Sequence, residues 1–147
     1  MRLVLQRVSR ASVAVGERIV SEIGPGLLIL VGVGVADEHP AAEAERLAEK
    51  VINLRVFEDA DGRMNRSLAD TGGEALVVSQ FTLYADTRKG RRPSWTDAAL
   101  PDVAEPAVEA LAHGLESRGI RVGRGVFGAH MRVELVNDGP VTILLEA

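Results

Sequence analysis

The chain opens with two short stretches in which apolar and polar residues alternate, a pattern typical of strands that bury one face. They span residues 2–8 and 11–15, and Gly16 begins a turn into a further strand. Residues 24–35 read GPGLLILVGVGV and are apolar on both strand faces, which predicts a fully buried central strand. Its glycines match neither GxGxxG nor a loop ending in GK[ST], so a phosphate-binding loop is not indicated.

Two later segments have the spacing of amphipathic helices, with apolar residues three and four positions apart. The first begins near Pro40, and we expect Asp37 to cap it. The second spans residues 101–118 and is stopped by Gly119. The apolar positions are Ala44, Leu47, Ala48, Val51 and Leu54 in the first helix and Val108, Leu111, Ala112 and Leu115 in the second.

The rest of the chain is predicted to form strands and turns. Residues 54–57 resemble a short strand, residues 58–65 a turn that lacks the downstream ligand of a calcium loop, and residues 74–85 a second buried strand ending in polar residues. The last third is strand-rich, and residues 137–142, NDGPVT, lie between two apolar stretches. The pattern predicts one α/β domain over residues 1–147, with two main helices against a largely antiparallel or mixed sheet.

Composition narrows the classes of function. The chain has 147 residues, 46% of them hydrophobic and 26% charged, and no apolar run approaches the roughly 20 residues of a membrane span. Its first residues lack the features of a signal peptide, so we expect a cytoplasmic location and no membrane partner. With no cysteine and with His39, His113 and His130 far apart in the sequence, we expect neither a metal nor another cofactor.

The first candidate site is the polar segment Ser79, Gln80, Phe81 and Thr82, at the end of a predicted buried strand. Hydroxyl and amide groups are costly to bury without partners, so the segment is expected to line a cleft. The alternative is an ordinary strand whose side chains bond to neighbouring backbone. A nucleophilic hydroxyl would need a base, and neither the lone His130 nor a GxSxG motif supplies one.

The second candidate is a basic loop, close to Tyr84 in the sequence, whose cations are Arg88, Lys89, Arg91 and Arg92. Four cations in five positions suit phosphate contacts, and the nearby aromatic residues, among them Trp95, could stack on a base. A solvated charged loop is the alternative. The net charge of −4 argues against nucleic-acid binding through overall charge but leaves room for a local patch.

The third candidate is the Gly139–Pro140 pair. Proline cannot donate to a sheet ladder, and the cis form of an X-Pro bond costs little. The pair therefore marks either a plain hairpin turn or a deliberately shaped backbone.

Taken together, the three candidates resemble the D-aminoacyl-tRNA deacylase family, which is known for an SQFT motif and an NxGPVT motif at this separation. Trp95 stands where that family usually has Phe. Further stretches that look like family landmarks are QRV, IGPGLLILVGV, LRVF, GRMN, VSQFTLYADTRKGRRPS and FGAHMRVELVNDGPVT.

The resemblance implies a barrel-like sheet in a cytoplasmic homodimer that hydrolyses the ester of D-aminoacyl-tRNA, or of glycine mischarged on alanine tRNA. It implies that Gly139–Pro140, in the cis form, enters the partner's pocket formed by residues 79–82, where it excludes L-amino acids. The 2′-hydroxyl of the terminal adenosine would assist catalysis, and the basic loop, residues 88–92, would contact tRNA phosphates. Two alternatives stay open: a relative with a trans Gly-Pro bond and relaxed chirality, and a non-catalytic RNA-binding module.

Overall fold

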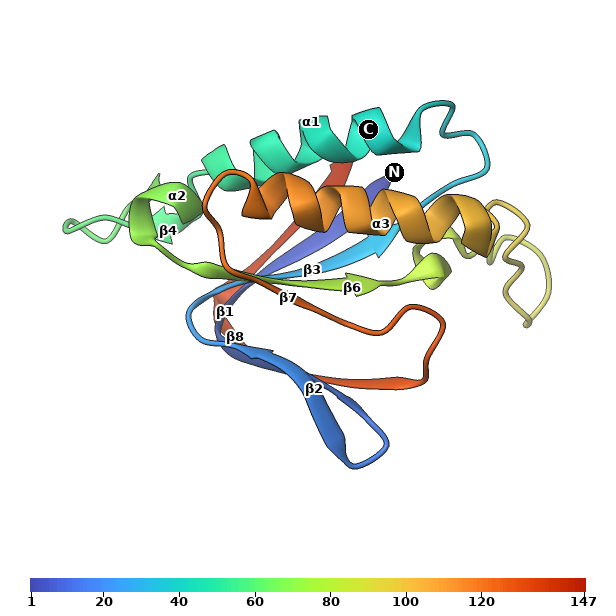
Figure 1. The fold of residues 1–147 in the computed structure, drawn as a ribbon, viewed down its shortest axis with the longest axis horizontal. Coiled ribbons are helices and arrows are strands. Elements are labelled where there is room, and N and C mark those ends of the chain that lie inside the picture. The colour runs from blue at the N-terminus through green and yellow to red at the C-terminus, as the bar shows by residue number, and fades with distance from the viewer.

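A computed structural model describes all 147 residues, and its centre is a six-stranded mixed sheet with two long helices over one face (Figure 1). The sheet strands are β1 (Arg2–Val15), β2 (Arg18–Ile23), β3 (Gly26–Gly32), β6 (Glu74–Ser79), β7 (Val122–Arg124) and β8 (Met131–Glu146). The helices are α1 (Pro40–Asn53), α2 (Leu68–Thr71), the 3₁₀ helix η1 (Phe81–Tyr84) and α3 (Pro101–Glu116). A separate hairpin joins β4 (Phe57–Glu58) to β5 (Met64–Arg66).

The long strand β1 organises the sheet. It pairs antiparallel with β8 along one edge and with β3 and then β2 along the other, while β3, β6 and β7 follow one another in parallel. The sheet curls until β2 contacts β6 and β7, so it is nearly closed. This confirms the predicted mixed, barrel-like α/β architecture, and no helix is long and apolar enough to cross a membrane.

Apolar side chains fill the space between the sheet and the two long helices. The predicted central strand is β3, and Leu27 and Ile29 on it are at most 1% exposed. On α3, Leu111 and Leu115 are fully buried against the same cluster. Truncating such a leucine to alanine typically costs about 2–5 kcal/mol of stability. The predicted helical stripes therefore locate the main core.

The predicted start of the first helix is wrong in one detail. His39, not Asp37, precedes α1, and no side chain caps that helix. Asp37 instead accepts a hydrogen bond from the Gly34 amide at 2.7 Å and pairs with the amino group of Met1 at 2.9 Å. The carboxylate is drawn away from the helix because a cation and a free amide lie closer to it.

Two predicted strands are shorter than expected. The strand predicted at residues 54–57 is reduced to β4, which pairs only with β5 across the predicted turn. The second buried strand ends at Ser79, because the chain then turns into η1. The second long helix ends at Glu116, so Gly119, with φ of +87°, belongs to the following turn.

The hairpin interpretation of NDGPVT is also wrong. Strand β8 continues through the motif, with Thr142 opposite Gln6 and Asn137 opposite Val8. Residues 138–141 therefore bulge out of the strand opposite the single residue Arg7. The Gly-Pro pair is displayed on a continuous edge strand and does not reverse the chain.

Candidate functional site

The end of β6 and the start of η1 line a cavity of about 380 Å³. Ser79, Gln80 and Phe81 all face this cavity, which confirms that the polar strand end borders a cleft. Its other walls come from β3, the segment before α3, α3 itself and the loop after β7. The lining residues from those parts include Val31, Trp95, Leu100, Ala104 and Phe127.

Two aromatic rings form an exposed wall of this cavity. The Phe81 and Trp95 rings meet edge to face, with centroids 5.6 Å apart and planes at 80°. Their exposed fractions are 55% and 41%, high for large apolar side chains. Aromatic surface left open at the mouth of an apolar cavity suits a flat ligand group, because rings and nucleobases stack on it.

Thr82 lies beside the cavity and does not line it. Its hydroxyl accepts a hydrogen bond from Nε2 of Gln80, so two residues of the SQFT motif are linked. No histidine, lysine or carboxylate lines the cavity. A hydroxyl nucleophile activated by a side-chain base is therefore not built here.

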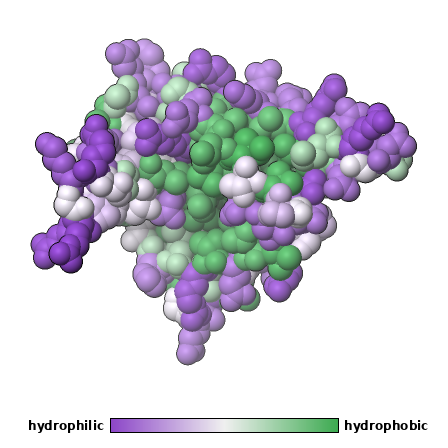
Figure 2. Space-filling model, turned by 180° about the vertical axis from the view of Figure 1, so that it is seen from behind, coloured by the Kyte–Doolittle hydropathy of each residue, from purple (hydrophilic) through white to green (hydrophobic).

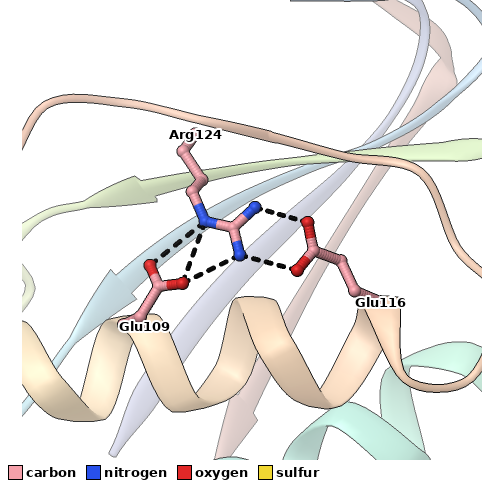
Figure 3. Close-up of polar contacts among 3 residues, drawn as sticks. All are labelled: Glu109, Glu116 and Arg124. Carbon is pink, nitrogen blue, oxygen red and sulfur yellow. Dashed lines mark hydrogen bonds and ion pairs between the residues drawn. The ribbon is translucent and has the colours of Figure 1, made fainter.

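A second cavity of about 360 Å³ adjoins the first and shares Ser79, Val108 and Phe127 with it. Arg124 on β7 closes one side by bridging two carboxylates of α3 (Figure 3). Its Nη1 donates to Glu116 at 2.6 Å, and its Nη2 donates to Glu109 at 2.9 Å.

The same clamp shifts the pKa values of Glu116 and Arg124. Hydrogen bonds from Arg124 lower the pKa of Glu116 from its usual value of 4.5. The two carboxylates in turn raise the pKa of Arg124. The clamp ties β7 to α3, and both elements border the second cavity.

The peptide bond between Gly139 and Pro140 is cis, the geometry that the family resemblance implies. Both residues are exposed and lie outside the cavity of their own chain. Gly139 has φ of +146°, and an added Cβ there would lie 2.7 Å from Cγ2 of Val141. Only glycine fits this position without a shift of the backbone.

Two side chains, Arg7 and Asn137, form hydrogen bonds with the backbone of the bulge. Arg7, only 5% exposed, donates from Nε to the Asp138 carbonyl at 2.8 Å and from Nη1 to the Val56 carbonyl at 2.7 Å. The Asn137 side chain accepts from the Val141 amide at 2.9 Å. Backbone on both sides of Gly139–Pro140 is thus fixed by hydrogen bonds.

The four cations of the basic loop differ in whether they form an ion pair. Arg88 is engaged within the loop, because its Nε and Nη2 donate to the two carboxylate oxygens of Asp86 at 2.9 and 2.7 Å. These bonds lower the pKa of Asp86 to about 2. Lys89, Arg91 and Arg92 are exposed and project from the same loop.

An apolar row crosses the sheet face that points away from the helices. Val4 on β1 is the register partner of Leu30 on β3 and of Leu144 on β8, and Leu144 is 72% exposed. From behind, the molecule shows a continuous apolar area across its middle, bordered by hydrophilic protrusions (Figure 2). Exposed apolar surface of this kind marks an interaction face.

Known proteins are similar to this chain in fold and in sequence. The solved structure of a protein named c-Myc DNA Unwinding Element Binding Protein superimposes with a TM-score of 0.91 at 41% identity, covering 100% of this chain and 99% of that one. A second solved structure, of a probable eukaryotic D-amino acid tRNA deacylase, has a TM-score of 0.84 at 18% identity over 98% and 97% of the two chains, and shows the fold alone.

Curated relatives match over the whole chain. The D-aminoacyl-tRNA deacylase of Roseiflexus castenholzii is 66% identical over 100% of this chain and 92% of its own length. That of Thermomicrobium roseum is 61% identical over 100% and 94%. Fold, cavity and relatives together define the chain as a hydrolase of the aminoacyl-tRNA deacylase class. It belongs to the family whose model is described as D-Tyr-tRNA(Tyr) deacylase and which matches residues 4–146.

Several residues of the site escaped sequence-based reasoning. Leu100, Ala104 and Phe127 reach the cavity from segments far apart in the chain, and no local pattern connects them. Arg7 is buried on the same face of its strand as Leu3 and Leu5, but its charge made it look like a solvent-facing residue. For Arg7 and Phe127 the only signals were the family landmarks QRV and FGAHMRVELVNDGPVT, which contain them, whereas Leu100 and Ala104 lie in no quoted motif.

Proposed function

We propose that the chain hydrolyses the ester bond that joins a D-amino acid to tRNA, releasing free tRNA and the amino acid. The observation that carries the proposal is the family match over residues 4–146 together with Ser79, Gln80 and Phe81 on the wall of a cavity. The aromatic wall made by Phe81 and Trp95 suits the terminal adenosine. Chiral proofreading of this kind serves translation, so the proposed location is cytoplasmic.

Catalysis on this proposal is assisted by the RNA. The 2′-hydroxyl of the terminal adenosine helps activate a water, whose oxygen attacks the ester carbonyl. The bond to the ribose oxygen then breaks, and that oxygen takes up a proton. Amides around Phe81 and Thr82 stabilise the developing oxyanion, and Thr82 positions water or carbonyl. No side-chain base lines the cavity, which supports activation of the water by the RNA and stabilisation of the oxyanion by the protein.

Selectivity is proposed to come from Gly139–Pro140 of the partner subunit. Its backbone carbonyls would hold the substrate's α-amino group and leave no room for an L side chain, which is rejection by steric exclusion. Glycine has no side chain and escapes such exclusion, so glycine mischarged on alanine tRNA is a second proposed substrate. The exposure of the pair, and its fixation by Arg7 and Asn137, support a rigid element presented outward.

The proposal requires a homodimer. The apolar row that crosses β3, β1 and β8 ends at the 72%-exposed Leu144, on the strand that also carries Gly139–Pro140. A symmetric contact through this face buries the row and brings β8 of each subunit against the other. Lys89, Arg91 and Arg92 would then contact phosphates near the acceptor end of tRNA.

One assay tests the function directly. Purified protein is incubated with D-tyrosyl-, L-tyrosyl- and glycyl-tRNA, and release of the amino acid is measured. Cleavage of the first and third substrates but not of the second is expected. Cleavage of L-tyrosyl-tRNA at a similar rate would instead identify a deacylase with relaxed chirality.

The same assay separates a non-catalytic nucleic-acid-binding protein from an enzyme. The 41%-identical relative of known structure carries the name of a DNA-binding protein, which makes this alternative concrete. Such a protein would bind D-tyrosyl-tRNA in a mobility-shift experiment and leave its ester intact. Thr82→Ala completes the design, because undiminished hydrolysis by this variant would contradict a role for the Thr82 side chain.

A further inference from the structure

Tyr84 is the last residue of η1, the short turn that also carries Phe81 and Thr82. Its ring lies directly on the backbone of Gly32 and Gly34 at the end of β3. A Cβ atom on Gly34 would lie 2.5 Å from Cε1 of the ring, and one on Gly32 would lie 3.2 Å from Cδ2. The distance at Gly34 leaves no room for a side chain, and the one at Gly32 is tighter than ordinary contact, so Gly34 above all serves here to admit the ring.

Arg2 holds the same turn from β1. Its guanidinium carbon lies 4.5 Å from the centre of the Tyr84 ring, a cation–π contact. Its Nη1 donates a hydrogen bond to the Leu83 carbonyl at 3.0 Å. A carboxylate oxygen of Glu146 on β8 pairs with Nε of the same guanidinium at 3.0 Å. Ring and carbonyl of η1 are therefore both anchored to one side chain of the sheet.

The anchor belongs to the rigid part of the fold. Arg2 is the register partner of both Gly32 on β3 and Glu146 on β8. The residues that contact the Tyr84 ring and its turn therefore come from three adjacent strands. The turn itself is only four residues long and is joined to β3 by the Gln80 amide, which donates to the Val31 carbonyl at 2.7 Å. A turn this short transmits a shift at Tyr84 to Thr82, two residues away.

We propose that Arg2, Gly34 and Tyr84 are positioning residues of the deacylase reaction, which set the orientation of the turn presenting Phe81 and Thr82 to the substrate. This inference rests on the proposed function of that turn. Burial, followed by the charge of Asp37, raises the pKa of Tyr84 to about 12. The phenol is protonated at neutral pH even at its ordinary pKa of about 10, so we assign the positioning to the ring and not to a charge on its oxygen.

The first test compares two glycine variants. In Gly34→Ala the new methyl group collides with the ring, whereas at Gly24 an added Cβ meets nothing within 4 Å. Gly34→Ala is expected to lower kcat for D-tyrosyl-tRNA on the order of 10- to 100-fold with KM little changed. Gly24→Ala is expected to keep the wild-type kcat. Thermal unfolding of both variants shows whether they are folded at the assay temperature.

A double-mutant cycle tests whether the loss of kcat in Gly34→Ala arises from the Tyr84 ring. Tyr84→Ala lowers kcat by itself, and adding Gly34→Ala to it causes little further loss because the colliding group is gone. Tyr84→Phe restores most of the kcat that Tyr84→Ala loses. Arg2→Met, at a more exposed position, is expected to lower kcat as well, and Arg18→Met on β2 serves as its control.

Each result shows whether Arg2, Gly34 and Tyr84 position the catalytic turn or only stabilise the fold. A wild-type kcat in folded Gly34→Ala, or an equal loss from Gly34→Ala with and without the ring, overturns the inference. If Gly34→Ala does not fold, a wild-type kcat in Arg2→Met overturns it instead. An inactive wild-type chain would overturn the proposed function too, whereas an active wild type with unaffected variants overturns the positioning alone.

Discussion

Nε of Arg7 donates a hydrogen bond to the main-chain oxygen of Asp138, 2.8 Å away, directly before Gly139–Pro140. The same buried guanidinium donates to the Val56 carbonyl at 2.7 Å. It therefore ties the bulge of β8 to the segment between α1 and β4. A single side chain connects the proposed selectivity element to the body of the subunit.

Replacing Arg7 with methionine keeps most of the side-chain volume and removes both hydrogen bonds. Two carbonyls lose their donor, so we expect a loss of about 1–3 kcal/mol in the free energy of unfolding. We also expect a smaller ratio of D- to L-tyrosyl-tRNA hydrolysis, because the bulge is released. Urea unfolding and the deacylation assay measure the two effects, with the exposed Arg10→Met on the same strand as control. Unchanged discrimination in folded Arg7→Met would contradict the anchoring role.

Complementation tests whether the site is shared between subunits. In the proposed homodimer, Gly139→Ala distorts the bulge through its contact with Val141 and Thr82→Ala alters the receiving side, so each variant alone is expected to lose activity. Mixed dimers contain one site with both wild-type elements. Refolding the two variants together in equal amounts should recover about a quarter of wild-type activity, because half the dimers carry one intact site of two.

The control for this mixture uses the apolar row. Leu144→Lys places a charge on the proposed contact face, so it is expected to yield a monomer in analytical ultracentrifugation. Introduced into both partners, it should abolish the recovered activity. Recovery that persists in monomers would rule out a site built from two subunits.

Trp95 provides an internal reporter because it is the only tryptophan of the chain. Adenosine, or a non-hydrolysable aminoacyl-adenosine analogue, is expected to change its fluorescence saturably by filling the cavity beside the ring. Phe81→Ala removes the ring that meets Trp95 and should weaken binding by about 1–3 kcal/mol. Ribose 5-phosphate, which lacks a base, should leave the emission unchanged. An equal response to both ligands would argue against an aromatic base site.

Within the basic loop, the structure distinguishes paired from unpaired cations. Neutralising Arg91 and Arg92 should weaken tRNA binding and reduce the slope of log affinity against log salt by roughly 1.4 to 1.8. Arg88→Gln should have a smaller effect, since Asp86 already balances that charge. Binding titrations at several salt concentrations measure both, with the exposed Arg46→Gln on α1 as control. An unchanged salt slope in the double variant would refute the phosphate assignment.

Much of the fold could be predicted because buried faces of strands and helices require apolar residues at regular spacings in the sequence. The apolar run at residues 24–35 indicated the central strand, and the spacing of Leu47 and Val51 indicated the buried face of α1. The prediction that Asp37 caps the helix failed because its carboxylate has two other partners: the Gly34 amide, three residues away, and the amino group of Met1, which only the folded chain brings near it. A local turn and one tertiary ion pair together replaced the expected cap.

The candidate site could likewise be predicted only where a local pattern in the sequence indicates it. Polar residues at the end of a buried strand marked Ser79 and Gln80 as cleft residues, and the structure places them there. The role of residues 138–141 as a bulge depends on how β8 pairs with β1, which a turn-like sequence does not encode locally. Phe127 and Arg7 likewise gain their place only from pairing between distant strands.

The Arg124 clamp makes a prediction about pH. Its hydrogen bonds lower the folded-state pKa of Glu116, while the unfolded chain keeps the usual value of about 4.5. A lowered pKa means that the carboxylate stabilises the fold above pH 4.5 and that this contribution is lost as pH falls through the folded value. Because the groups are partly exposed, we expect Arg124→Met to cost only about 1 kcal/mol at pH 7. In urea unfolding, the difference between wild type and Arg124→Met should shrink steadily below pH 4.5. A difference that stays constant down to pH 2 would show that the cost comes from lost packing and not from the ion pairs.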